Sequence, residues 1–218
     1  MPQITALFAT PVAFARHPDP GVLNAELREL FLSREREGAR WANPNPYTQR
    51  NAELFESHFE LFKWPEPCVQ RLKQFCWAEL TQLVATINRY DPATMQRTRL
   101  HADSWFHITR RGGYFGIHNH PMASWSGVYC VAGGQHDPDR PDSGQLCFIN
   151  PAITNTMYVD VATAQMTAPY NCGSRHFTLQ AGDLVLFPSW LLHEVKPFWG
   201  TGERITVAFN CAFTVVND

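Results

Sequence analysis

Residues 182–195 read GDLVLFPSWLLHEV, and this stretch decides the fold that we expect. A glycine turn leads into the apolar strand Leu184–Pro188, and a second turn then leads to His193. Arg204 follows eleven residues after His193, in the next expected strand. Two antiparallel neighbours with a short connection would place these two side chains next to each other. Burying an arginine in a strand rich in Val, Ile and Phe costs free energy unless its guanidinium pairs with an anion. That anion is either a carboxylate of the protein itself or the carboxylate of a bound ligand.

A second stretch, residues 114–121, reads YFGIHNHP and contains two histidines at i and i+2. Alternate residues of a strand point to the same face, so His118 and His120 can direct both imidazoles at one ion. His193 would complete the set from another strand. Three imidazoles leave coordination positions free for water or substrate, as a catalytic metal centre requires. The alternative is that the histidines are polar residues at strand ends and bind no metal.

The composition indicates a packed globular protein. The chain has 218 residues, of which 44% are hydrophobic and 17% charged, and its net charge is -2. These values argue against direct binding to nucleic acid or to an anionic membrane. The apolar stretch Ile4–Ala15 lacks a preceding basic region, and no run is long enough to cross a bilayer. The six cysteines form no Cys-x-x-Cys pair and lie in apolar stretches, so we expect a cytoplasmic protein with reduced, buried thiols.

The first part of the chain is expected to be helical. Leucine spacing predicts one helix over Gly21–Glu37, and a short helix is expected within Asn51–Phe62. A third helix starts at Pro67 and stops at Asp91-Pro92. We therefore expect a helical region, residues 1–96, that packs on a β-sheet core, residues 97–218, within a single domain overall.

From residue 97 onward, short apolar and aromatic runs alternate with Gly, Pro, Asn and Asp, which is typical of strands and turns. The expected strands are Arg97–Arg110, Tyr114–His118, Ser124–Ala132, Gly144–Asn150, Thr156–Val161, His176–Leu179, Leu184–Pro188, His193–Val195 and Glu203–Thr214. The predicted fold class is mostly β with N-terminal helices (α+β), as a sandwich or barrel. A double-stranded β-helix, the cupin-like jelly roll, flanked by helices is one such solution. The loops Gly133–Gly144 and Thr154–Gly173 are candidates for a lid over a site.

These motifs resemble the 2-oxoglutarate and iron(II)-dependent oxygenases, in particular a bacterial and phage group of them. The matching segments are residues 104–108, 118–121, 126–131, 143–148, 182–195 and 203–210. The resemblance implies a double-stranded β-helix that holds Fe(II) at its open end. It implies that His118, His120 and His193 are the metal ligands. It also implies that Arg204 binds the distal carboxylate of 2-oxoglutarate, the co-substrate.

By the same analogy, further side chains are expected to line the co-substrate pocket. Thr206, Ser126 and Cys130 lie on the implied faces, and Asn210 shares strand parity with Arg204 and Thr206. Tyr129 is the opposite-face alternative to Cys130, because a one-residue change of register exchanges the two faces.

One position departs from the common pattern of two histidines and one carboxylate, because His120 stands where the family has an acidic residue. Three neutral ligands leave the ion with its full positive charge, which attracts a dianionic co-substrate. Asp103 or His101 could take the place of His120 as a ligand, or Glu194 could act from outside the ligand set, but His120 is kept as the second ligand. The implied activity is hydroxylation of a small-molecule or peptidyl substrate with release of succinate and CO2. Two alternatives stay open: a three-histidine cupin-type metalloenzyme that does not use 2-oxoglutarate, and a non-catalytic ligand-binding β-sandwich. A homodimer also stays open.

Overall fold

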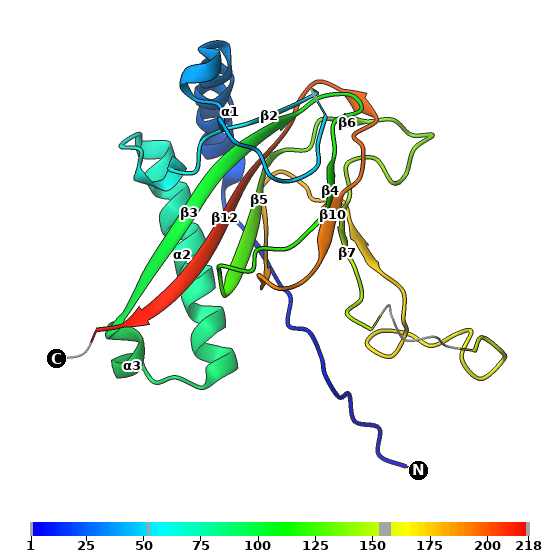
Figure 1. Cartoon of the computed structure of the whole chain (residues 1–218). Coiled ribbons are helices and arrows are strands. Elements are labelled where there is room, and N and C mark those ends of the chain that lie inside the picture. The colour runs from blue at the N-terminus through cyan, green and yellow to red at the C-terminus, as the bar shows by residue number, and fades with distance from the viewer. Residues whose placement is uncertain (1, 52, 153–157, 217–218) are drawn as a thin grey trace.

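The computed structural model describes residues 2–51, 53–152 and 158–216. Its strands form two antiparallel sheets that face each other (Figure 1). The larger sheet has the order β1 (Ala13–Arg16), β9 (Asp183–Pro188), β5 (Trp125–Ala132), β12 (Arg204–Val215), β3 (Thr98–Thr109) and β2 (Leu54–Glu56). The smaller sheet has the order β4 (Phe115–His118), β10 (His193–Val195), β7 (Leu146–Phe148) and β8 (Arg175–Phe177). The pair β6 (Gln135–His136) and β11 (Gly200–Thr201) lies apart from both. This arrangement is the predicted double-stranded β-helix.

The helices lie on the outer face of the larger sheet, as expected (Figure 1). They are α1 (Pro20–Arg36), α2 (Pro67–Asn88) and α3 (Pro92–Gln96), with short 3-10 turns at Gly38–Arg40 and Leu61–Lys63. Each α-helix starts with proline, whose fixed φ suits the first helical position. The helix predicted from Pro67 does stop before Asp91, through a left-handed residue at Arg89. Among the helices of the described ranges, none has the length and apolar character needed to span a bilayer.

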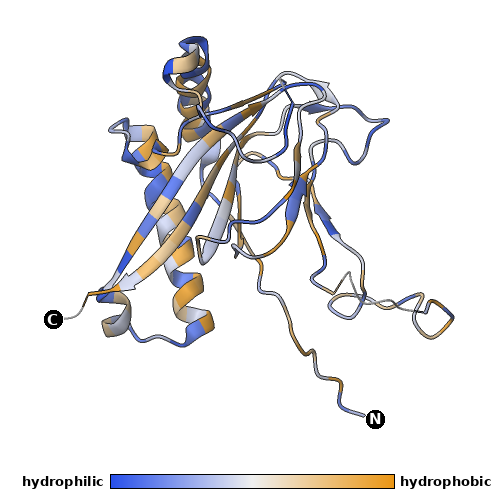
Figure 2. Ribbon diagram, in the orientation of Figure 1, coloured by the Kyte–Doolittle hydropathy of each residue, from blue (hydrophilic) through white to orange (hydrophobic). Residues whose placement is uncertain are grey.

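Two apolar layers explain why strand β9 is a continuous apolar run. Leu184 and Leu186 face the helices and join the core between helices and sheet. Val185 and Phe187 face the other way and join the core between the two sheets. Both faces of β9 are therefore buried, and the strand is apolar at every position after Asp183. Figure 2 shows the contrasting pattern on α2, β3 and β12, which carry polar and apolar residues in alternation.

Two sequence predictions about secondary structure need correction, and one strand was missed. The short helix expected within Asn51–Phe62 is wrong, because Leu54–Glu56 forms the edge strand β2 next to β3. The strand expected over Thr156–Val161 is absent from its described part, residues 158–161, which has no regular structure up to the bend and turn that begin at residue 160; the remainder lies outside the described residues. Strand β1 was not predicted, since an edge strand of four residues carries little pattern of its own.

Strands β1 and β2 come from the first 96 residues and extend both edges of the larger sheet. The helices of that region also share one apolar core with β3, β5, β9 and β12. The division at residue 97 stays a prediction. The prediction of buried thiols is confirmed for Cys68, Cys76, Cys130, Cys147 and Cys211, which form no disulfide with any described residue.

Replacement of Phe31 by alanine is expected to lower the free energy of unfolding by about 3 to 5 kcal/mol. Phe31 of α1 is fully buried and stacks on Phe106 of β3, with ring centroids 4.2 Å apart. Urea denaturation measures the change. Val22→Ala on the same helix is the control, because Val22 is 65% exposed and its truncation should cost less than about 0.5 kcal/mol. Equal effects of the two substitutions would contradict the packing described here.

Candidate metal centre

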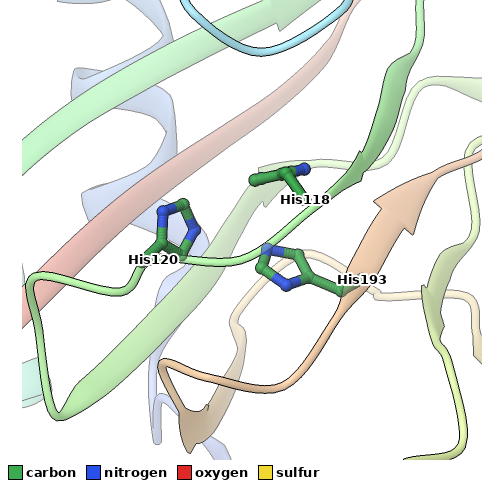
Figure 3. A group of neighbouring side chains, drawn as sticks. All are labelled: His118, His120 and His193. Atoms are coloured by element: carbon green, nitrogen blue, oxygen red, sulfur yellow. The ribbon is translucent and has the colours of Figure 1, made fainter.

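Three histidines meet between the two sheets, at one end of the fold. His118 is the last residue of β4, His193 is the first residue of β10, and these two are directly paired across the strands. One ligand atom from each of His118, His120 and His193 lies within 4.8 Å of the other two (Figure 3). His120 lies beyond the end of β4, in the turn that follows it. Its backbone N–H donates to the carbonyl of Ser189, so the turn rather than strand alternation directs its ring.

Backbone hydrogen bonds orient two of the rings. Nδ1 of His118 lies 2.7 Å from the carbonyl oxygen of Gly116, and Nδ1 of His193 lies 2.8 Å from that of Leu191. A carbonyl can only accept, so Nδ1 carries the proton in each ring. Nε2 of both rings then presents a lone pair to the space between the histidines. Such outer hydrogen bonds fix the tautomer of metal-binding histidines.

The electrostatics favour the neutral form that binds metal. Burial, followed by the neighbouring His118, lowers the pKa of His193 to about 3. The same two causes lower the pKa of His120 to about 4, and burial also lowers the pKa of His118. All three imidazoles are therefore neutral at pH 7. A set of three neutral ring nitrogens at this separation fits a divalent transition metal.

In metal-free protein, the free energy of unfolding is expected to fall as the pH is lowered from 7 to 5. Unfolded histidines take up protons near pH 6.5, whereas His193 and His120 in the folded state resist protonation down to about pH 3 and 4. Protons therefore bind the unfolded state preferentially in this window, and stability is lost as pH falls through it. Above pH 7 both states are neutral, and the dependence disappears.

Each fully buried histidine contributes up to about 2 kcal/mol between pH 7 and pH 5. Urea titrations of chelator-treated protein at several pH values measure the slope. His193→Gln should flatten it, whereas His136→Gln, at an exposed position, should leave it unchanged. A flat wild-type profile over this window would contradict the predicted pKa shifts.

Arg204 opens strand β12 and is almost fully buried, with 5% of its surface exposed. Within the described ranges, no carboxylate forms an ion pair with its guanidinium, and no hydrogen bond from its side chain is found. The internal salt bridge considered from the sequence is therefore absent from this part of the chain. Gly144 makes room for the side chain: a Cβ there would lie 3.1 Å from Arg204 Cδ. A buried, unpaired cation of this kind requires an anionic ligand.

The histidines and Arg204 line one cavity of about 640 Å³ between the sheets. Of the other predicted residues, Ser126, Thr206 and Asn210 also line it. Cys130 lies on the same face of β5 but is covered by the core between the sheets. Tyr129, the opposite-face alternative to Cys130, does not face the cavity. Its ring lies in the core on the helix side, and its hydroxyl donates to Asn24 of α1 at 2.7 Å. The register of β5 settles the choice against Tyr129.

One acidic residue of the cavity wall, Glu56, was not identified from the sequence. Glu56 of β2 is 7% exposed, and its Oε2 lies 3.1 Å from Nε2 of His107, its partner on β3. Trp105 Nε1 also lies 2.8 Å from this ring nitrogen, which can accept from Trp105 or donate to Glu56 but not both. Burial raises the pKa of Glu56, but the contacts with His107, Asn43 and Arg50 hold it below its ordinary value. His107 is buried and also lines the cavity.

The two candidate lid loops lie elsewhere. Neither Gly133–Gly144 nor the described part of Thr154–Gly173 contributes a residue to the cavity wall. The mouth is instead formed by Tyr47 and Thr48 and by the turn after β4, residues 119–123. No sequence pattern pointed to residues 47–48, which lie far from the histidines along the chain.

A family model described as "Putative 2OG-Fe(II) oxygenase" matches residues 103–210. The matched region runs from β3 to β12 and contains the three histidines and Arg204. The chain belongs to the 2OG-Fe(II) oxygenase superfamily. Membership agrees with the resemblance drawn from the motifs. Among curated protein sequences, none matches this chain.

Solved structures show the same fold at low sequence identity. A prolyl-4-hydroxylase from Pseudomonas putida is 19% identical, with a TM-score of 0.58, over 93% of this chain and 92% of its own. HygX from Streptomyces hygroscopicus, with nickel, 2-oxoglutarate and hygromycin B bound, is 12% identical, with a TM-score of 0.56, over 93% and 83%. A prolyl hydroxylase from Trichoplax adhaerens, in complex with a hypoxia inducible factor peptide, is 13% identical, with a TM-score of 0.57, over 92% and 82%.

Proposed function

We propose that this protein is an Fe(II)- and 2-oxoglutarate-dependent dioxygenase that hydroxylates its substrate and releases succinate and CO2. The observation that carries the proposal is a buried arginine that has no carboxylate partner among the described residues and shares a cavity with three converging histidines. The histidines supply a site for a divalent metal, and Arg204 supplies a site for an anion. A dianionic keto acid is the ligand that uses both. The nickel and 2-oxoglutarate in HygX, which has this fold, support the assignment.

The spacing along β12 fits this ligand. Trp105 is paired with Ala208 across β3 and β12, and its ring centroid lies 6.1 Å from that of His120. The histidine cluster is therefore close to the level of Ala208. Arg204 lies four residues away on the same strand, which corresponds to about 14 Å along the strand axis. An extended arginine side chain and a five-carbon dicarboxylate together can span this distance.

His118, His120 and His193 would hold the iron, which supplies the oxidative decarboxylation of the co-substrate and the oxidation of a C–H bond. Arg204 would bind the distal carboxylate through its two-pronged guanidinium and so orient the keto acid. Thr206, two residues further on the same face, would donate a hydroxyl to that carboxylate. The buried walls of the cavity exclude bulk water, which strengthens these interactions.

The decisive experiment is an anaerobic calorimetric titration of 2-oxoglutarate into protein loaded with Fe(II) or Zn(II), followed by assay of succinate in air. We expect metal-dependent binding, with succinate formed only when Fe(II) is present. Glutarate is the control, because it keeps both carboxylates and lacks the keto group that a metal binds. Metal binding without 2-oxoglutarate binding would favour the three-histidine cupin-type enzyme. Failure to bind metal would favour a non-catalytic β-sandwich.

We further propose a small-molecule or peptidyl substrate, since the cavity mouth is open between residues 47–48 and 119–123. A cytoplasmic location is part of this proposal and is supported by the five buried cysteines, which form no disulfide with any described residue. A homodimer stays a prediction, which sedimentation of the purified protein will test.

A further inference from the structure

A hydrogen-bonded polar row crosses the larger sheet on the side of the histidines away from Arg204. Ser126 Oγ donates to Asn210 Oδ1 at 2.8 Å and lies 2.8 Å from Ser189 Oγ. Ser126 has one hydrogen to donate, so Ser189 donates to Ser126. Both serines are almost completely buried, at 1% and 0% exposed. In this arrangement the Asn210 amide oxygen faces Ser126, and its NH2 group is left toward the cavity.

Asp103 lies directly opposite Asn210, as its paired residue on β3, and both line the cavity. Asp103 is exposed and feels the charge of Lys63, which lines the same cavity, but within the described ranges neither the Asp103 carboxylate nor the Asn210 NH2 group has a hydrogen-bond or ion-pair partner. The carboxylate can only accept and the NH2 group can only donate. An aromatic pair flanks them, since the rings of Phe59 and Trp105 lie 4.5 Å apart in the same wall.

These groups lie within reach of the metal centre. Asn210 is two residues from Ala208, the level of the histidine cluster, which corresponds to about 7 Å along β12. Arg204 lies on the other side of that level. A ligand held by Asp103 and Asn210 would therefore approach the metal from the side opposite to the co-substrate. For this reason we assign Asn210 to the substrate. The resemblance to the oxygenases had placed Asn210 in the 2-oxoglutarate pocket instead.

We propose that Asp103 and Asn210 are the specificity-determining residues for the primary substrate, which carries a protonated amine next to a hydrogen-bond acceptor on an apolar body. Asp103 binds the amine, Asn210 donates to the acceptor, and Phe59 and Trp105 contact the apolar part and favour the cation through their ring faces. This inference rests on the proposed dioxygenase function, because that function identifies which end of the cavity remains for a substrate.

Binding of matched small probes tests the inference. L-phenylalaninol carries the amine, the hydroxyl acceptor and an aromatic body; 3-phenylpropan-1-ol lacks the amine, and 2-phenylethylamine lacks the hydroxymethyl group. Affinities are measured by calorimetry for protein loaded with Zn(II) and 2-oxoglutarate, and again for chelator-treated protein. We expect L-phenylalaninol to bind about fivefold or more tightly than either analogue, given one partly exposed charged contact.

Two variants separate the two contacts. Asp103→Asn should abolish the preference over 3-phenylpropan-1-ol, and Asn210→Ala should abolish the preference over 2-phenylethylamine. Glu26→Gln is the control, because it removes an equal charge from an exposed carboxylate that pairs with Arg71, and neither residue lines the cavity. It should leave both preferences unchanged.

The proposal is overturned if L-phenylalaninol does not bind, if wild type binds the three probes equally, or if Asp103→Asn keeps the amine preference. Failure of the dioxygenase function has a different signature. In that case 2-oxoglutarate does not bind to metal-loaded wild type, whereas the probe preferences are still measured in the chelator-treated protein.

Discussion

Replacement of Arg204 by methionine is expected to weaken the binding of 2-oxoglutarate by about a hundredfold or more, because a buried charge pair loses one partner. The guanidinium is buried and has no carboxylate of the described chain beside it. Its interaction with the ligand is therefore not shared with an internal partner. Methionine keeps much of the side-chain volume and removes the charge. Calorimetric titration of metal-loaded protein measures the change in affinity.

The thermal stability of the same variant gives an independent readout. Removal of an unpaired buried cation should leave the ligand-free fold as stable as wild type or more stable, since its desolvation cost disappears. 2-Oxoglutarate should raise the melting temperature of wild type, and this increase should disappear in Arg204→Met. Arg204→Lys should retain part of the affinity, because it keeps the charge and loses the planar fork.

Arg110→Met is the matched control. Arg110 lies on the surface near the end of β3 and is paired with Glu35 of α1 at 2.6 Å. Its loss should change 2-oxoglutarate affinity by less than about twofold, since ion pairs at the surface contribute little to the stability of the fold that holds the binding site. If Arg204→Met and Arg110→Met bound the co-substrate equally well, the anion site would have been assigned to the wrong residue.

The sequence predicted the β-helix well where a strand has an unambiguous environment. Strand β9 is apolar on both faces, and β12 alternates Arg204 and Thr206 toward the cavity with Ile205 and Val207 toward the helices. Strand β2 was mistaken for a helix because three residues at a sheet edge depend on the pairing with β3 and carry no period of their own. Long-range pairing, rather than local propensity, determines such short edges.

The candidate site was predictable to the extent that its spacing is local or follows strand parity. His118 and His120 were recognisable as a pair two residues apart, and His193 through the strand that precedes it. Glu56 was not recognisable, because its contact with His107 joins positions 51 residues apart. The choice between Cys130 and Tyr129 required the register of β5, which hydropathy leaves open when both faces of a strand are buried.

Replacement of His193 by alanine is expected to lower metal affinity by at least about a hundredfold, since one of three ligands is lost. His193 is 4% exposed, and its ring is held by the Leu191 carbonyl, so no other side chain of the described cavity wall replaces its nitrogen without a rearrangement. Succinate formation should fall below detection. Metal content after dialysis, together with a competition titration against a chelator, measures the change. His101→Ala, at the exposed rim of the same cavity, is the control and should retain the metal.

His120 allows a sharper test, because an aspartate at this position restores the common set of two histidines and one carboxylate. If His120 is a ligand, His120→Ala should lose metal affinity while His120→Asp keeps it, since a carboxylate oxygen takes the place of the ring nitrogen. The Asp variant also reduces the net charge of the centre by one, so its affinity for the dianionic co-substrate should fall relative to wild type. Equal metal affinity of wild type, His120→Ala and His120→Asp would mean that the ion is held by His118 and His193 alone. In that case the ring of His120 would lie beside the ion without binding it.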